Sequence, residues 1–142
     1  MLDKEYFIHV GKKNYAESLA YCKSIGGKLA EPKVRKEKNQ LVTLAKSVTI
    51  EGPGVWIGVN DPNKDKSFTY ASNGKSLEFR NWYPGEPSKK YPGEACVFMK
   101  KSYGFKWNDS FCSKKMSFVC ERVENTGNFN NFYCEPSITA YT

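Results

Sequence analysis

The chain has 142 residues, a net charge of +7 and an aromatic content of 15%. This length suits one domain with a hydrophobic core and is too short for two. No apolar run is long enough to cross a membrane, and no basic helix carries interleaved aromatic residues, so the composition argues against a membrane span and against nucleic-acid binding.

The N-terminal part of the chain predicts a strand followed by a helix. The segment "EYFIHV", residues 5–10, alternates as a strand does. A helix is predicted over "NYAESLAYCKSIGG", residues 14–27. Asn14 is a suitable N-cap, and Glu17 three positions later completes a capping box. The glycine pair at the end of this segment predicts where the helix stops.

A second helix is predicted from about Pro32 to Val48. Proline suits the first turn of a helix because its missing N–H would have no partner there. One face of the segment is apolar, and the run "KVRKEK" lies largely on the solvent side. The residues expected to face the core are Val34, Leu41, Leu44, Ala45 and Val48.

After "EGPG", residues 51–54, the pattern changes to short strands separated by Gly, Pro, Asn and Asp. The expected strands are "VWIGVN" (55–60), "SFTYA" (67–71), "LEF" (77–79), "ACVFM" (95–99), "FKWN" (105–108) and "SFVCERV" (117–123). A long segment with one clear strand lies between Arg80 and Trp107, and long loops in compact domains usually carry function. Two helices followed by strands indicate an α+β fold. Residues 124–142 are polar and Asn-rich, which predicts a flexible tail.

The cysteines bear on the compartment. The chain has five, together with a single His, and they are Cys22, Cys96, Cys112, Cys120 and Cys134. None forms a C-x-x-C pair, so a zinc site has too few ligands at useful spacing. Two disulfides and one odd cysteine are expected, which favours an oxidising compartment; buried free thiols are the alternative. Spacing alone does not decide which cysteines pair.

Several motifs occur together in an order that resembles the C-type lectin-like domain. They are "WIGV" (56–59), "GEP" (85–87), "GEAC" (93–96), "KWND" (106–109) and "FVCER" (118–122). Each motif alone is weak, but their joint order around four cysteines is specific. The resemblance covers about residues 5 to 123.

This resemblance implies an architecture. The expected fold has two helices flanking antiparallel sheets, with a long loop that binds calcium and sugar. Residues 1–123 would form the domain and 124–142 the tail. The disulfides would join Cys22 to Cys120 and Cys96 to Cys112. Cys134 is left over, and either it pairs with another chain, giving a homodimer or heterodimer, or it stays a free or capped thiol.

The resemblance also implies a Ca²⁺ site, whose ligands would be Glu86, Ser88, Glu94, Asn108 and Asp109. Calcium takes six to eight oxygen ligands, which these residue types supply. Glu86, Ser88, Glu94 and Asn108 would also contact the sugar. Pro87 matches a position where the family has a cis peptide bond. Ser88 departs from the family, which has Asn there, so one amide carbonyl and one NH₂ donor are missing.

A second calcium site is not expected. Asp61 and Asp65 lie in "NDPNKD", where strong turn chemistry indicates turn residues. Lys89 stands where the family often has Asn, and a lysine beside a calcium site is unfavourable.

The function expected from the resemblance is a secreted, extracellular, calcium-dependent lectin. Because Glu precedes Pro in the motif, the sugars would be of the mannose, fucose or N-acetylglucosamine type, and the role would be innate immune recognition of microbial glycans. The scattered lysines keep sulfated glycans open as ligands. The alternative is a calcium-independent module that binds a protein or a polyanion such as a glycosaminoglycan. No catalytic motif is present, so an enzyme is not expected.

Overall fold

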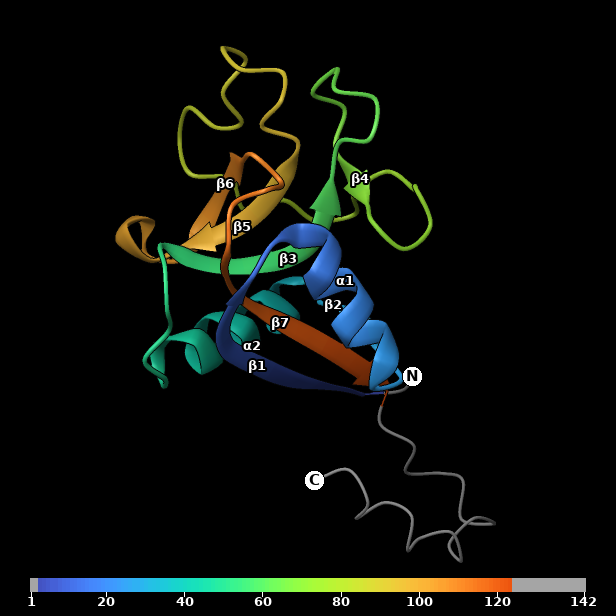
Figure 1. Ribbon diagram of the computed structural model, residues 1–142, viewed down its shortest axis with the longest axis vertical. Helices are drawn as coiled ribbons and strands as arrows, with labels where there is room; N and C mark the ends of the chain where they lie inside the picture. The colour runs from blue at the N-terminus through green and yellow to red at the C-terminus, as the bar shows by residue number, and fades with distance from the viewer. Residues whose placement is uncertain (1–2, 124–142) are drawn as a thin grey trace, which may run out of the picture.

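Residues 3–123 are described by a computed structural model, which is shown in Figure 1. The regular elements of this part of the chain are β1 (Lys4–Lys13), α1 (Tyr15–Ser24), β2 (Lys28–Leu29), α2 (Arg35–Lys46), β3 (Gly54–Asn60), β4 (Thr69–Tyr70), β5 (Cys96–Lys100), the 3₁₀ turn η1 (Lys101–Tyr103), β6 (Lys106–Ser110) and β7 (Met116–Val123). The predicted tail, with Cys134, lies outside the described residues.

The strands form one sheet in the order β1-β7-β3-β5-β6, with β2 beside β7 and β4 beside β3. Lys4 pairs with Val123, so the beginning and the end of the domain lie side by side (Figure 1). The expected fold is confirmed, with one refinement. All the pairs between named strands are antiparallel except β3 and β7, which run parallel at Val55 and Ser117, so the sheet is mixed.

The first helix begins and ends close to where the sequence predicts. The Asn14 side chain accepts from the Glu17 backbone N–H, and the Glu17 carboxylate accepts from the Asn14 backbone N–H, each at 2.9 Å. This capping box satisfies two backbone groups that have no partner inside the helix. The helix ends at Ser24, and Gly26 follows with a φ of +83°, a left-handed conformation that glycine adopts without a steric penalty.

The second helix is shorter than predicted. It begins at Arg35 after an extended N-cap, Val34, so the prediction that Pro32 lies in its first turn is wrong. The Pro32 carbonyl instead accepts a hydrogen bond from the Tyr70 hydroxyl, a contact that fixes this residue before the helix. Leu41 and Ala45 are buried as predicted and Leu44 is partly buried, whereas Val34 and Val48 are exposed.

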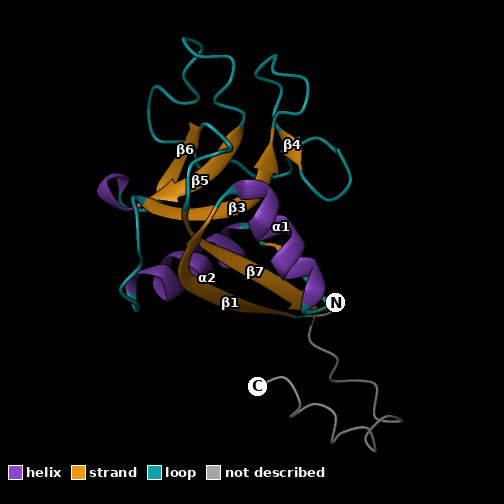
Figure 2. Ribbon diagram, in the orientation of Figure 1, coloured by secondary structure: helices purple, strands orange, loops and turns teal. Residues whose placement is uncertain are grey.

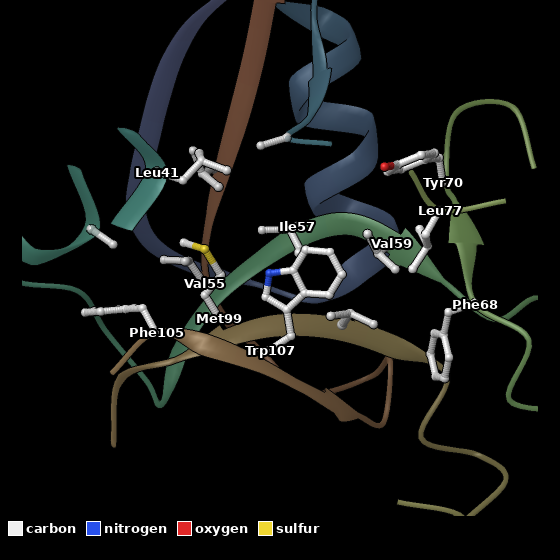
Figure 3. Packing of buried hydrophobic residues seen from close by; sticks show 14 of the residues in the cluster. Leu41, Val55, Ile57, Val59, Phe68, Tyr70, Leu77, Met99, Phe105 and Trp107 are labelled. Atoms are coloured by element: carbon white, nitrogen blue, oxygen red, sulfur yellow. The ribbon is translucent and has the colours of Figure 1, made fainter. Parts of the chain in front are cut away.

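Strand β3 lies between two hydrophobic clusters, because its side chains alternate between the two faces of the sheet. Val55, Ile57 and Val59 pack with Trp107 and Leu41 on one face (Figure 3). Trp56 packs on the other face with Phe118 and the Cys22–Cys120 disulfide. Only glycine fits at position 58, because the Cβ atom of any other residue would lie 2.6 Å from the Leu29 carbonyl oxygen.

The two expected disulfides are present. Cys22 in α1 is bonded to Cys120 in β7, and Cys96 at the start of β5 is bonded to Cys112. The predicted strand "LEF" is wrong: residues 77–79 form no strand, although Leu77 is buried and Phe79 packs against the core. Within residues 3–123, no helix has the length and apolar character that a membrane span requires.

Candidate functional site

Two long loops rise together above one end of the sheet. One follows β3 and covers residues 61–68; the other leads from β4 to β5 and covers residues 71–95 (Figure 2). Strand β6 passes beneath them and carries Asn108 and Asp109. The predicted ligands therefore come from the second loop and from β6.

The second loop is held to the sheet by backbone and aromatic contacts. The Tyr83 N–H donates to the Trp107 carbonyl at 3.0 Å, and the Trp107 N–H donates to the Asn81 carbonyl at 2.9 Å. The rings of Tyr83 and Tyr103 stack with centroids 3.7 Å apart. The Cys96–Cys112 disulfide joins the end of this loop to the segment just after β6. These contacts position an irregular segment that has few ladder hydrogen bonds of its own.

Glu86 and Asp109 meet at the centre of the site. The Glu86–Pro87 peptide bond is cis, as the resemblance implied. The Ser88 N–H donates to Oδ1 of Asp109 at 3.3 Å. Asp109 is buried, and Oε1 of Glu86 is buried without a hydrogen-bond partner among residues 3–123. An orphaned carboxylate oxygen beside a second buried carboxylate is an unfavourable arrangement unless a cation offsets it.

The pKa values of Glu86 and Glu94 also favour a cation at this site. Burial raises the pKa of Glu86 above its ordinary range, and the adjacent Asp109 carboxylate raises it further. Burial also raises the pKa of Glu94, as does the Asp109 charge, while Lys66 and Lys114 lower it. Burial and neighbouring carboxylates thus disfavour the ionised forms of both glutamates, which a bound cation would stabilise.

One cation of the chain already reaches this cluster. The Lys66 ammonium lies 2.9 Å from Oδ2 of Asp109, and it also donates to the carbonyls of Tyr91 at 2.9 Å and Glu94 at 3.1 Å. Lys66 therefore ties the first loop to the second loop and to β6. The sequence motifs did not single out Lys66; the lysine expected beside the site was Lys89.

The first loop is built around Asp61, which is fully buried. Its carboxylate accepts the N–H groups of Asp65 at 3.2 Å and Lys66 at 2.8 Å, and Oδ1 of Asp65 accepts the Ser67 N–H at 3.0 Å. The turn role predicted for both aspartates is thereby confirmed. These bonds also fix Lys66 with a φ of +66°, from which its side chain crosses to the second loop.

The remaining predicted ligands are Ser88, Glu94 and Asn108, of which only Ser88 has a side chain with a hydrogen-bond partner in the described domain. The Glu94 carboxylate and the Asn108 amide are half-buried, and neither makes a hydrogen bond or ion pair with another residue of the described domain. The Ser88 hydroxyl accepts the Lys90 N–H at 3.2 Å. Within residues 3–123, no three His, Cys, Asp or Glu side chains alone form a ready metal cage. A cation here would need the amide and backbone oxygens as well as the carboxylates.

The donor set fits a hard cation. All the candidate ligand atoms are oxygens, from Glu86, Ser88, Glu94, Asn108 and Asp109, and oxygen is the ligand that Ca²⁺ prefers. Softer transition metals favour imidazole or thiolate, and the one imidazole of the chain, His9, lies elsewhere and stacks on Phe118.

Comparison with known proteins identifies the family of the domain. The family described as "Lectin C-type domain" matches residues 11–122. Human Collectin-10 is 40% identical over 124 residues, which are 86% of this chain and 43% of that protein. Salivary C-type lectin 2 of Aedes albopictus is 35% identical over 112 residues, 74% of each protein. The chain thus spans less than half the length of the collectin and about three quarters of the mosquito lectin.

Solved structures show the same fold. Human lithostathine has a TM-score of 0.78 and 30% identity, covering 85% of this chain and 84% of that one. The cow C-type carbohydrate-recognition domain of CD23, solved in the presence of a GlcNAc2Man3 oligosaccharide, has a TM-score of 0.74 and 29% identity, with 88% and 92% covered.

Proposed function

The chain belongs to the C-type lectin domain family, and on that basis we propose that it is a secreted, calcium-dependent carbohydrate-binding protein. The observation that supports this most directly is the cluster of Glu86, Glu94 and Asp109. The Asp109 carboxylate adds to the burial that raises the pKa of both glutamates, and the Lys66 ammonium pairs with Asp109. The proposed function is binding, not catalysis.

The residues divide into two roles. Glu86, Glu94, Asn108 and Asp109 would hold calcium through side-chain oxygens, and Ser88 would take part through its hydroxyl oxygen, directly or through water. When bound, calcium supplies coordination to two neighbouring hydroxyls of a sugar. Glu86 and Glu94 accept hydrogen bonds from those hydroxyls, and the Asn108 amide donates to them. Because Ser88 lacks the amide donor of Asn, we expect a weak single-site affinity.

The sugar class follows from the order of residues in the loop. Glu86 precedes the proline, which in this family favours mannose, fucose or N-acetylglucosamine. The CD23 structure was solved with a mannose-containing oligosaccharide. Secretion is supported by the two disulfides and by the name of the mosquito relative. Cys134 would join two chains and raise avidity for clustered glycans, including those on microbial surfaces, and electrophoresis with and without reductant tests this.

Calcium titration followed by sugar titration tests the proposal. We expect calorimetry to show one calcium bound per chain, and methyl α-D-mannoside to bind at millimolar strength in calcium. EDTA should abolish sugar binding, because without the ion the hydroxyls meet only carboxylates and an amide. If calorimetry with the native protein showed no heat of calcium binding, the calcium site would be ruled out, and the calcium-dependent function with it.

A second candidate is a calcium-independent module that binds protein or polyanion. The contacts of Lys66 favour it, because they hold both loops without any metal. The net charge of +7 would attract a polyanion. Binding to heparin that survives EDTA and falls steeply with salt, with no response to calcium, would select this candidate over the first.

Lys66 should oppose calcium while stabilising the metal-free domain. We expect Lys66→Met to bind calcium about tenfold more tightly, because a positive charge beside a divalent ion costs roughly 1.7 kcal/mol at 5 Å in water. In EDTA the same variant should be less stable by about 2 to 3 kcal/mol, since the buried Asp109 carboxylate loses its counter-charge. Calorimetry and urea denaturation measure the two effects.

Lys64→Met is the matched control. Lys64 lies in the same loop, also has a positive φ, and is exposed with no side-chain partner among the described residues. The Lys64→Met variant loses the same charge but no contact with Asp109, so its calcium affinity and its stability in EDTA should both stay near the native values. An equal gain in calcium affinity in both variants would show that net charge, not the position of Lys66, controls the site.

A further inference from the structure

A cavity of about 540 Å³ adjoins the proposed calcium site. Glu86, one of the proposed calcium ligands, also lines this cavity, so a saccharide held at the calcium would lie next to it. Apart from Glu86 and Lys66, the residues that line the cavity have no role in the calcium site proposed here. We propose that this cavity is a second subsite, which binds an anionic group, either a sulfate ester or a carboxylate, carried by the saccharide.

The basic residues that line the cavity are the main evidence for an anionic ligand. Three basic residues line the cavity, Lys66, Arg80 and Lys89, against one acid, Glu86. Lys66 is engaged by Asp109. Arg80 and Lys89 are exposed and have no hydrogen-bond, ion-pair or ring partner within residues 3–123. Two uncommitted cations converging on one cavity from separate parts of the loop favour an anionic ligand.

The floor of the cavity is apolar, which suits the carbon face of a sugar ring. Phe68 and Leu77 are buried there, and the rings of Phe68 and Trp82 meet edge to face with centroids 5.1 Å apart. An apolar floor with a few convergent polar groups is typical of a ligand site.

The basic surface continues past the cavity. A neighbouring cavity of about 400 Å³ shares Lys66 and Lys89 and adds Lys64, with Asp65 as its one acid. A longer acidic saccharide would therefore find positive charge on both sides of Lys89. The proposed subsite rests on the proposed function and extends it, because it identifies the residues that would bind the acidic group of a glycan.

Matched probes test the subsite. Methyl α-D-mannoside, its 6-sulfate and a glucuronic acid-bearing mannoside are titrated in calcium at 150 mM salt. Native protein should bind at least one acidic probe about tenfold more tightly than the neutral one, and comparing the two acids tells sulfate from carboxylate. Arg80→Gln and Lys89→Gln should each reduce this preference at least threefold while leaving the affinity for the neutral mannoside within twofold.

Arg35→Gln is the control, because Arg35 is exposed in α2 and its replacement lowers the net charge equally. Absence of any preference in the native protein, or an equal loss in Arg35→Gln, would overturn the subsite while leaving neutral sugar binding intact. Repeating the titration with a heparin-derived tetrasaccharide in EDTA separates the two proposals. If neutral sugar and calcium fail to bind but the tetrasaccharide binds and depends on Arg80, the subsite stands and the calcium-dependent function falls.

Discussion

Asp109→Asn is expected to weaken calcium binding at least 100-fold. Asp109 is the group that the other ligands share: it raises the pKa of both glutamates, accepts from Ser88 and pairs with Lys66. An amide keeps the shape of the side chain but removes its charge. The attraction between a divalent ion and a carboxylate at about 4 Å is roughly 2 kcal/mol in water, or about 30-fold, and it is larger in a half-buried site, which brings the expected loss to about 100-fold or more. Calorimetric titration with calcium measures it.

The same substitution should destabilise the metal-free domain by about 3 kcal/mol. The Asp109 side chain is fully buried and that of Lys66 is 11% exposed, so removing the charge leaves a largely desolvated ammonium without its partner. Relief of repulsion with the glutamates offsets part of this cost. Urea denaturation in EDTA gives the change in free energy of unfolding.

Asp65→Asn is the matched control for Asp109→Asn. Asp65 is exposed, and its Oδ1 accepts one backbone N–H, a role that an Asn oxygen also fills. We expect neither calcium affinity nor stability to change by more than a small amount. If Asp109→Asn lost stability in EDTA but kept native calcium affinity, Asp109 would be only the partner of Lys66, and the metal would have to bind elsewhere.

The local signals in the sequence predicted the elements well where neighbours in the chain decide the structure. The capping box of Asn14 and Glu17 is one case, because both groups lie within a single turn. The start of α2 was predicted wrongly because a distant hydroxyl, that of Tyr70, holds Pro32 outside the helix. The segment "LEF" has strand composition, but Phe79 packs edge to face against Trp107 and its backbone forms no ladder.

The residues of the site also divide into those that the sequence motifs predicted and those that only distant contacts bring together. The motifs brought Glu86, Glu94, Asn108 and Asp109 into one hypothesis through resemblance. In the structure Asp109 lies close enough to both glutamates to raise their pKa values, and Asn108 precedes it in β6. Lys66 was not predictable from its sequence context, where a lysine between Asp65 and Ser67 has the appearance of a solvated turn residue. Its partner Asp109 is 43 positions away in β6, and the folding of the first loop, with its left-handed backbone at Lys66, brings the two side chains into contact.

Removing the Cys22–Cys120 disulfide should have the largest effect on stability. The bond joins residues 98 positions apart, and chain-entropy estimates give about 4.7 kcal/mol for a loop of that size. Both sulfurs lie in the hydrophobic cluster around Trp56, so Ala is the suitable replacement at each position. We expect Cys22→Ala/Cys120→Ala to lower the free energy of unfolding by 4 to 5 kcal/mol, a large part of the roughly 5 to 15 kcal/mol typical of a domain. Urea denaturation at 25 °C, without reductant, measures the loss.

The second disulfide provides the contrast, because it closes a shorter loop but braces the site. Cys96 and Cys112 are 16 positions apart, for which the same estimate is about 3 kcal/mol. Cys96 follows Glu94 closely and Cys112 follows Asp109, so this bond fixes the two ligand segments relative to each other. Cys96→Ala/Cys112→Ala should therefore weaken calcium binding at least tenfold at a temperature where the variant is folded, whereas the Cys22 and Cys120 pair should leave it within threefold. Equal calcium affinities in the two double variants would mean that the strand pairing of β5 with β6, and not the disulfide, positions Glu94 against Asp109.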